Sequence, residues 1–594
     1  MRLRYALWFA LAAGLLEAAL LVAHGRQIHG FIYLSPHLVW MAPVANLLWF
    51  GVAMLLLGAA GRAFPSLGTT RATLTVCIFL AALSILMLPS QLHRIAATLI
   101  ALGAAIQGSR VLLPRLEPFD RLVRRTLPAM LGAIVLMGTG MAGWAILQER
   151  RELGSLPAAR AGAPNVVLLV LDTVRRASMS LYGYERQTTP ALERWAERGV
   201  RFEHAITTAS WTLPSHASMF NGRLPGEMSA GWLTPLDGTY PMVAEQLKLA
   251  GYSTAGFVAN LLYCNRSFGL GRGFIHYEDY RVSPGELVVN SSIGRALSEI
   301  RLIRRLTGYH DILGRKTGAD ITDRFLAWQE SAGDRPYFAF LNYFDAHQPY
   351  LPPAESAARF GPVSGRSFGL LELRPYMGKI ENAETSLTPG QVEAEQNAYD
   401  ATLAYLDGEI DRLLSELERR GALENTVVII TSDHGEQFME HRLFDHGNSL
   451  YRFATEVPLL MLGGDVPRGL VASSPVSLAD LPATIMDLTA TIMDLTATST
   501  TFPGRSLRAG WSGSETSRRA VISETRGPGP ERRFEAIVAD DFHAIWSANS
   551  VELYSFSGDP GETRNLASSS EGAALLATLR QALDSAAGRR PETP

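Results

Sequence analysis

The chain has 594 residues, with 54 Lys and Arg against 57 Asp and Glu and a formal net charge of −3. A balance this close to neutral argues against a nucleic-acid partner, and the length allows a large catalytic domain with accessory parts. Apolar residues are concentrated in the first 150 positions, whereas the rest has the composition of a soluble domain. The sequence therefore predicts a membrane protein with a globular head.

The apolar N-terminal region, residues 1–148, contains runs that approach the length needed to cross a bilayer, although the fourth is short. The runs are 5–23, 39–60, 72–88, 95–106 and 127–147. Arginines at positions 2 and 4 and in the loops after the second and fourth runs indicate the cytoplasmic side. We expect about five spans in the lipid bilayer and a multi-pass protein. The catalytic head would then be extracytoplasmic, periplasmic if the cell is bacterial; without the short fourth run it would face the cytoplasm.

Cysteine usage excludes two kinds of site. Cys77 lies in an expected span and Cys264 in the head, so we do not expect the two to pair. The sequence has no CxxC motif, which excludes a thiolate zinc site. Residues 149–163 are first charged and then rich in Gly, Ala and Pro, which indicates a linker to the head.

In the head, apolar runs typical of buried parallel strands alternate with helical patterns. Strands are expected at 165–171, 253–259, 337–343, 426–431 and 458–462, with helices at 190–198, 242–250, 320–329 and 391–420. This alternation predicts an α/β fold, a mainly parallel sheet flanked by helices, over residues 164–509. Short strand-like pieces after residue 510 predict a small C-terminal α+β layer, 510–594, that ends in a polar tail.

The segment ATIMDLT occurs twice in succession, at 483–489 and 490–496. Two copies do not make a solenoid. Seven added residues are about two helical turns and nearly preserve an apolar face, so a surface helix can absorb them. We interpret the duplication as functionally neutral.

Residues 210–222 place a hydroxyl group near the start of an expected helix. Pro214 suits the first helical position, so Thr212 would lie beside unpaired N–H groups at the positive end of the helix dipole. Phosphoryl and sulfuryl groups favour that place. Thr before Pro-Ser is also ordinary helix-capping chemistry, so the partners of Thr212 elsewhere in the chain decide its role.

Polar residues follow the ends of the expected strands, where ligands gather in parallel α/β sheets. Asp172 follows the first strand, and Asp433 and His434 follow the fourth. A threonine hydroxyl needs a base or a metal to become a nucleophile, and these three residues, with the Thr212 oxygen, can supply the metal site. Their mixed oxygen and nitrogen donors favour Mn²⁺ or Zn²⁺ over Ca²⁺, while Mg²⁺ and Ca²⁺ stay open.

Asp345, His347 and His446 admit two interpretations. They could hold a second metal, or they could donate hydrogen bonds to the non-reacting oxygens of a substrate. We favour the donors, because only one of the three is a carboxylate.

Six motifs follow one another along the head: NVVLLVLDT at 165–173, the Thr212 segment, DAHQPY at 345–350, TSDHGE at 431–436, HGNSLY at 446–451 and DPGETRNL at 559–566. These motifs, in this order, resemble those of the sulfatase-like branch of the alkaline phosphatase superfamily. The resemblance implies an alkaline-phosphatase-like fold and Thr212 as the nucleophile. It also implies metal binding by Asp172, Asp433 and His434, and contact of His347 and His446 with the ester group.

The chain departs from true sulfatases at the nucleophile. They carry Cys or Ser, converted to formylglycine, with Arg two residues beyond the Pro, where this chain has Thr212 and His216. We therefore expect no formylglycine, and we place His216 with Asp345 in the expected substrate-binding set. Threonine resembles the membrane enzymes that move phosphoethanolamine or phosphoglycerol from lipids onto envelope polymers. The Asp433-His434 pair fits that group too, whereas Ala177-Ser178 replaces an Asp-His pair of close relatives.

The sequence thus predicts a membrane-anchored, metal-dependent enzyme that cleaves or transfers a phosphate-type ester through a phosphothreonine. Thr212, His347 and His446 are the expected catalytic residues. A lipid headgroup or an envelope glycan is the expected carrier of the ester. The first alternative is a hydrolase of sulfuric or phosphoric esters, and the second is a non-catalytic binding module, which the metal-ligand set disfavours.

Overall fold

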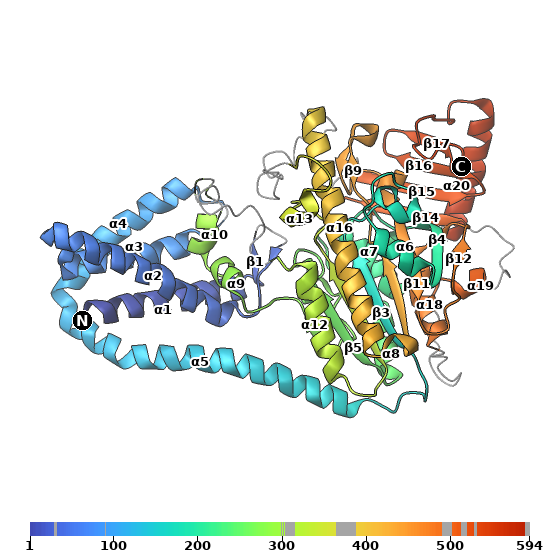
Figure 1. Cartoon of the computed structure of the whole chain (residues 1–594). Helices are drawn as coiled ribbons and strands as arrows, with labels where there is room; N and C mark the ends of the chain where they lie inside the picture. Colours follow the sequence, from blue (N-terminus) through green and yellow to red (C-terminus); the bar gives the residue numbers. More distant parts are fainter. Residues whose placement is uncertain are drawn as a thin grey trace. The chain divides into compact units, whose positions relative to one another are not determined.

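The computed structural model describes residues 1–28, 32–89, 91–298, 300, 302, 315–363, 388–489, 502–511, 520–527 and 532–587 (Figure 1). The chain divides into two compact units. The first comprises Met1–Arg151 and Tyr280–Gly314, and the second comprises Glu152–Asp279 and Arg315–Pro594. The predicted boundaries at 148, 163 and 509 stay predictions, but residues 280–298, which we expected within the head, group with the N-terminal helices.

Each apolar run of the N-terminal region matches a helix, although the run 72–88 extends two residues past its helix. The helices are α1 (Arg2–Ala23), α2 (Leu38–Ala63), α3 (Thr70–Leu86), α4 (Arg94–Leu112) and α5 (Leu116–Ser155). Among the described residues, three helical stretches are long and apolar enough to cross a membrane: Arg2–Ala23, Leu38–Ala63 and Arg94–Ser155, the last containing both α4 and α5. The 17-residue α3 is apolar but shorter. The number of spans and their orientation stay predictions.

Two short helices from the middle of the chain belong to the same unit as these N-terminal helices. They are α9 (Pro284–Val289) and α10 (Ser292–Ser298). Val289 packs against an apolar cluster of α1 and α2, and the Trp49 indole N–H donates to Ser291 Oγ at 2.9 Å. The unit is therefore held together by contacts between segments more than 200 residues apart in sequence.

The carboxylate of Glu17 is fully buried within the otherwise apolar α1. Its Oε2 accepts a hydrogen bond from Asn46 Nδ2 of α2 at 3.1 Å. Its Oε1 accepts one from the Ser292 backbone N–H of α10 at 2.5 Å and lies 3.7 Å from Arg295 Nη2. One side chain thus ties α1 to both α2 and α10.

Replacing Glu17 with leucine is expected to loosen α10 from α1 and α2. The change leaves Arg295 without its buried counter-charge, a loss that typically costs about 3–5 kcal/mol. Thermal unfolding of the full chain in detergent should shift down, and limited trypsin digestion should cut faster within residues 280–298. Glu117→Leu, the same change at an exposed site of α5, is the control and should alter neither readout. Equal digestion of Glu17→Leu and wild type would contradict the role of Glu17.

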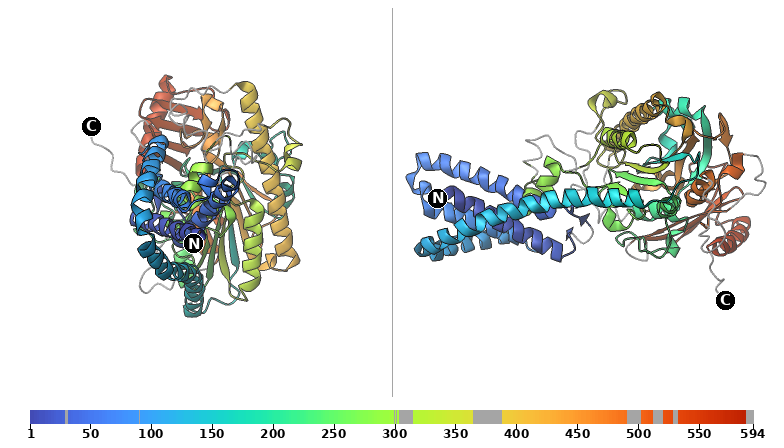
Figure 2. Two further views of the ribbon diagram at one scale, coloured as in Figure 1. Left: turned by 90° about the vertical axis from the view of Figure 1, so that its left-hand side faces the viewer. Right: turned by 90° about the horizontal axis from the view of Figure 1, so that it is seen from below.

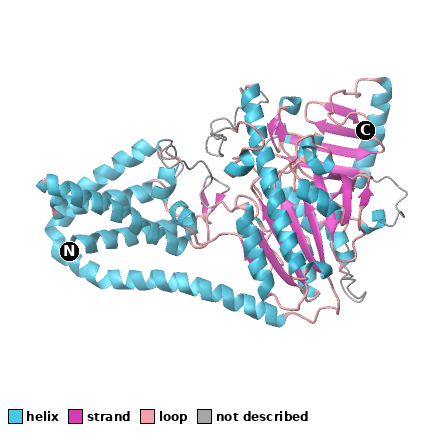
Figure 3. Cartoon of the chain, viewed as in Figure 1, coloured by secondary structure: helices cyan, strands magenta, loops and turns pink. Residues whose placement is uncertain are grey.

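The second unit is built on a large sheet (Figure 3). Its described residues form nine strands, in the order β12-β4-β11-β8-β3-β7-β5-β6 with β13 paired to β4. The strands are β3 (Asn165–Leu171), β4 (Gly199–Ile206), β5 (Ser253–Val258), β6 (His276–Glu278), β7 (Tyr337–Tyr343), β8 (Thr426–Thr431), β11 (Glu456–Leu462), β12 (Leu470–Ala472) and β13 (Val476–Ser477). The central strands β8, β3, β7 and β5 are parallel, which confirms the predicted mainly parallel sheet.

One predicted strand runs against the expected direction. We assigned 458–462 to the buried parallel strands, but β11 pairs antiparallel with both β8 and β4. All of β11 is buried, and after Glu456 its residues are apolar. Such a run does not reveal whether the strand is parallel or antiparallel to its neighbours.

Helices flank the sheet in two groups (Figure 2). One group contains α6 (Pro190–Ala196), α12 (Gly318–Ser331) and α16 (Pro389–Arg419), and the other contains α7 (Thr212–Asn221), α8 (Val243–Leu249) and α18 (Leu481–Leu488). The long α16 begins after Thr388, whose side chain accepts from the Gln391 backbone N–H. It ends before Gly421, which adopts the left-handed conformation with φ 68°. The apolar residues of its predicted face, from Tyr399 to Leu417, are buried.

The C-terminal layer is a four-stranded antiparallel sheet of β14 (Val521–Arg526), β15 (Arg533–Ala539), β16 (Phe542–Ser547) and β17 (Val551–Ser555). The predicted small C-terminal layer is confirmed, but the predicted polar tail is in large part a helix, α20 (Ser570–Ala586). Leu579 and Leu583 of α20 are buried against the sheet, two apolar positions one helical turn apart within a polar sequence. The first ATIMDLT copy reaches into α18, whereas the second, 490–496, lies outside the described residues.

Candidate active site

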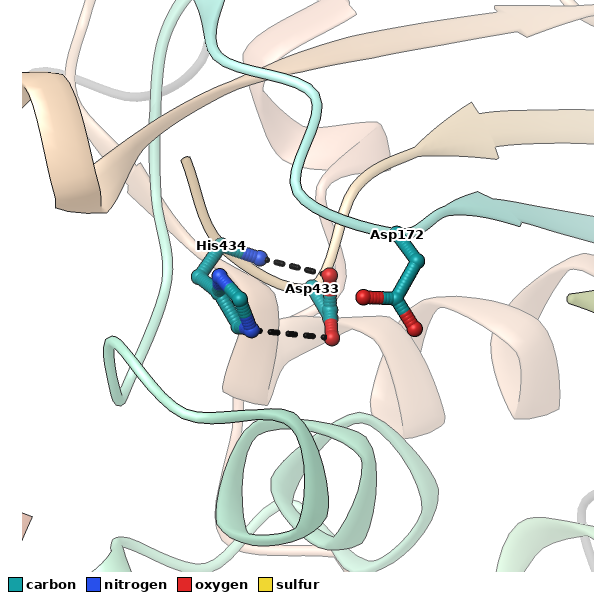
Figure 4. Close-up of side chains that lie close together, drawn as sticks. All are labelled: Asp172, Asp433 and His434. Carbon is teal, nitrogen blue, oxygen red and sulfur yellow. Dashed lines mark hydrogen bonds and ion pairs between the residues drawn. The ribbon is translucent and has the colours of Figure 1, made fainter. Parts of the chain in front are cut away.

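The three predicted metal ligands come together at the carboxyl ends of two adjacent strands. Asp172 follows β3, and Asp433 and His434 follow β8, with β3 and β8 paired in parallel. Their ligand atoms lie within 4.8 Å of one another, and all three side chains are fully buried. Figure 4 shows the two carboxylates facing each other, with the His434 imidazole on the far side of Asp433.

Each carboxylate has one oxygen that accepts hydrogen bonds within the protein, and Asp433 Oδ2 lies in addition 3.4 Å from His434 Nε2. Asp172 Oδ2 accepts from Asn260 Nδ2 at 2.8 Å. Asp433 Oδ1 accepts from the backbone N–H groups of His434 and Thr173 at 2.9 and 3.2 Å. Asp172 Oδ1 and Asp433 Oδ2 have no hydrogen-bond partner among the described residues. Two buried carboxylate oxygens without partners are costly, so this arrangement fits a bound cation.

The protein alone disfavours the charged form of these groups. Burial raises the pKa of Asp172 well above its usual range, and the nearby Asp433 carboxylate raises it further. Burial also raises the pKa of Asp433 and lowers that of His434 well below the usual range. A divalent cation favours ionised carboxylates and a neutral imidazole. Two carboxylates and an imidazole beside a hydroxyl are donors suited to Mn²⁺ or Zn²⁺.

Thr212 lies next to this group. Its Oγ1 is 3.3 Å from His434 Nε2, and its side chain is buried. We expected Pro214 to be the first helical residue. The helix α7 begins at Thr212 itself, so Pro214 is the third. Ser215, one residue later, fixes the first turn of α7 by donating to the Asp433 carbonyl at 2.6 Å.

His216 packs behind the nucleophile candidate. Its Nδ1 donates to the Thr212 carbonyl at 2.9 Å and lies 3.5 Å from Asp433 Oδ2. Its Nε2 is 3.8 Å from Cys264 Sγ. The ring is fully buried, and burial lowers the pKa of His216. These contacts brace Thr212 and Asp433, and the predicted substrate-binding role of His216 stays a prediction.

The structure joins two further predicted histidines to this group but gives Asp345 other contacts. The His446 ring centroid lies 4.4 Å from that of His434 and 5.1 Å from that of His347. By contrast, Asp345 Oδ1 accepts from the Gly318 backbone N–H at the start of α12, at 3.0 Å. Burial raises the pKa of Asp345 to about 6. A substrate-binding role for Asp345 stays a prediction.

Sequence reasoning missed the amides that hold Asp172. Besides Asn260, Asn342 places its Nδ2 3.4 Å from Asp172 Oδ2, and its Oδ1 accepts from the Asn260 backbone N–H at 2.8 Å. Asn342 lies near the end of β7, and Asn260 follows β5. The strand-end rule that found Asp172 could therefore have found both.

Comparison with known proteins relates this chain to one family. The Sulfatase family model matches residues 164–492. The chain is 26% identical over 352 residues to arylsulfatase K of Homo sapiens, covering 54% of this chain and 62% of that protein. It is 24% identical over 450 residues to choline-sulfatase of Rhizobium meliloti, covering 70% and 85%. The chain therefore spans less than two thirds of the arylsulfatase K relatives.

Solved structures share the fold. The phosphonate monoester hydrolase of Agrobacterium radiobacter aligns with a TM-score of 0.56 and 19% identity over 72% of this chain and 95% of that one. A protein solved in complex with its substrate D-glucosamine-2-N,6-O-disulfate aligns with a TM-score of 0.56 and 19% identity, covering 71% and 97%. The family model itself covers more than half of this sequence. The chain belongs to the sulfatase family.

Proposed function

We propose that this protein is a membrane-anchored, metal-dependent enzyme that cleaves or transfers a phosphate-type ester, with Thr212 as its nucleophile. The observation that carries the proposal is the position of Thr212 Oγ1, 3.3 Å from His434 Nε2. His434 is grouped with two buried carboxylates, each with one oxygen that has no hydrogen-bond partner in the described structure. Asp172, Asp433 and His434 would hold the metal. When bound, it would favour the ionised form of the Thr212 hydroxyl and offset negative charge on the ester oxygens.

The reaction would proceed by two displacements. Thr212, having lost its hydroxyl proton to solvent, forms a bond to phosphorus while the bond from phosphorus to the leaving oxygen breaks. One of the two nearby histidines, His347 or His446, gives a proton to that leaving oxygen. Water or a second hydroxyl then displaces Thr212 from phosphorus and gives its proton to the same histidine, which restores the starting state. Hydrolysis and transfer differ only in this second acceptor.

The apolar N-terminal helices support the membrane anchoring in this proposal. A protein held in the bilayer by these helices meets esters carried by lipid headgroups or envelope glycans, and we place the head on the extracytoplasmic side. The nucleophile supports a phosphate-type ester, because threonine cannot become formylglycine. Family membership supports the second candidate, a sulfuric ester hydrolase, since choline-sulfatase is among the relatives.

A substrate panel tests these candidates. We expect the purified full chain, supplied with Mn²⁺ or Zn²⁺, to turn over nitrophenyl phosphate monoesters or diesters faster than nitrophenyl sulfate. Removing the metal with a chelator should stop turnover, and adding it back should restore it. Faster turnover of the sulfate ester would reverse our order of candidates. Stoichiometric metal without any turnover would favour the binding module instead.

A further inference from the structure

Glu436 is a buried carboxylate to which the proposed reaction gives no role. It lies two residues after His434 and is fully buried. Its Oε1 accepts from His446 Nδ1 at 3.1 Å, and its Oε2 accepts from the Tyr350 hydroxyl at 2.8 Å. A buried carboxylate with both oxygens engaged holds its partners in a defined geometry.

The hydrogen bond to Glu436 decides which nitrogen of His446 is available. Because a carboxylate only accepts, Nδ1 carries the proton in this contact and Nε2 is left for other partners. The His446 ring is confined by its neighbours, with the centroids of His434 and Trp211 at 4.4 and 5.3 Å. These contacts fix the position of the ring. The carboxylates of Glu436 and Asp445, 3.1 and 2.8 Å from Nδ1, stabilise the imidazolium, in which Nε2 also carries a proton that it can donate.

A second carboxylate, Asp445, also lies close to His446 Nδ1, at 2.8 Å. Its Oδ1 already accepts from the His446 backbone N–H, and its side chain is 26% exposed. Glu436 is fully shielded from water, which makes its hydrogen bond the stronger constraint. The ligand atoms of these three residues lie within 4.8 Å of one another, but their mutual hydrogen bonds occupy Nδ1 and favour an orienting set over a second metal site.

Tyr350 in turn fixes Glu436. The Tyr350 side chain is buried, and its ring packs against Tyr399 of α16 and Phe438, with centroids 5.5 and 5.8 Å away. Tyr350 follows β7, Glu436 follows β8, and His446 follows the short strand β10 (Phe444–Asp445). The contacts therefore join three separate segments around one imidazole.

We propose that Glu436 is a positioning residue: it holds His446 so that Nε2 donates a hydrogen bond to the leaving oxygen of the ester, and Tyr350 holds Glu436. This inference rests on the proposed function. A role through His446 has a specific consequence, because a poor leaving group such as an alkoxide needs the donor, whereas a nitrophenolate does not.

The test is a double-mutant cycle on the full chain, with wild type, Glu436→Gln, His446→Ala and the double variant. Each is assayed on an alkyl and a nitrophenyl ester of the preferred class. We expect Glu436→Gln to lower kcat on the alkyl ester about 10- to 100-fold, with KM nearly unchanged and a much smaller effect on the nitrophenyl ester. In the His446→Ala background, Glu436→Gln should cause no further loss.

Several outcomes would overturn the proposal. They are equal losses on both esters, a further loss in the His446→Ala background, loss of bound metal from Glu436→Gln, or two metals per chain in wild type. An equal or larger selective effect of Asp445→Asn would assign the role to Asp445 instead. Tyr350→Phe removes only the hydroxyl and should give a smaller loss with the same selectivity. If Glu436→Gln does not fold, Tyr350→Phe becomes the test. Equal losses of kcat by Tyr350→Phe on both esters would then overturn the proposal.

Failure of this inference and failure of the proposed function can be told apart. An active Thr212→Ala variant would remove the proposed nucleophile, yet the coupling between Glu436 and His446 would still be measurable. Additive losses in the cycle would remove the positioning role and leave Thr212 untouched.

Discussion

Replacing Thr212 with alanine is expected to abolish turnover and to leave the fold and the bound metal largely intact. The variant lacks the hydroxyl that attacks the ester, a loss that lowers kcat by on the order of 10³-fold or more in enzymes with covalent intermediates. The metal ligands keep their places because strands β3 and β8 position them, and Thr212 contributes one hydrogen bond of 3.3 Å to His434. Steady-state kinetics, thermal unfolding and metal analysis of the same preparation measure the three effects.

Thr212→Ser is the matched control. Serine keeps a hydroxyl at the first position of α7, so this variant should retain part of the activity. Mass spectrometry of rapidly quenched wild type should also find the ester on Thr212, and the alanine variant should carry none. Turnover by Thr212→Ala close to that of wild type would contradict the nucleophile assignment.

The strands that carry the site could be predicted to the residue. β3, β7 and β8 begin and end where the sequence analysis placed them, because a buried parallel strand is a continuous apolar run bounded by polar residues. The metal ligands follow from the same pattern, since parallel strands bring their carboxyl ends to one edge. Asp172 and Asp433 are thus brought together by the pairing of β3 with β8.

Features set by tertiary contacts could not be predicted. Asp345 follows a strand as Asp172 does, yet the Gly318 N–H at the start of α12 engages its carboxylate, and no local pattern reveals that contact. The grouping of α10 with α1 likewise depends on the Glu17 carboxylate meeting Ser292 across 275 positions of sequence. The α20 helix is a different case, because Leu579 and Leu583 have helical spacing that a closer analysis of the tail would have recognised.

Asp172→Asn is expected to abolish metal binding and turnover together. Asparagine keeps the shape of the side chain but removes one of two negative charges. Asp172 Oδ1 is also one of the two oxygens of this carboxylate pair that have no hydrogen-bond partner in the described structure. Because loss of a residue that only supports a ligand weakens metal binding 10- to 100-fold, loss of a ligand should weaken it by more than about 100-fold. Titration with Mn²⁺ or Zn²⁺ followed by thermal unfolding measures this loss. Asp345→Asn, at a partly buried strand-end carboxylate, should keep the metal.

In the metal-free protein the same substitution, Asp172→Asn, should raise thermal stability instead of lowering it. Burial and Asp433 raise the pKa of Asp172 above its value in the unfolded chain. The stability linked to its proton is present below the unfolded pKa and is lost as pH rises through the folded pKa. At neutral pH, chelated wild type therefore bears a cost that Asp172→Asn lacks, so the chelated variant should unfold at the higher temperature, by a margin that shrinks in acid. A chelated variant less stable than chelated wild type would show that the two carboxylates do not repel each other. Stoichiometric metal in Asp172→Asn would remove Asp172 from the ligand set.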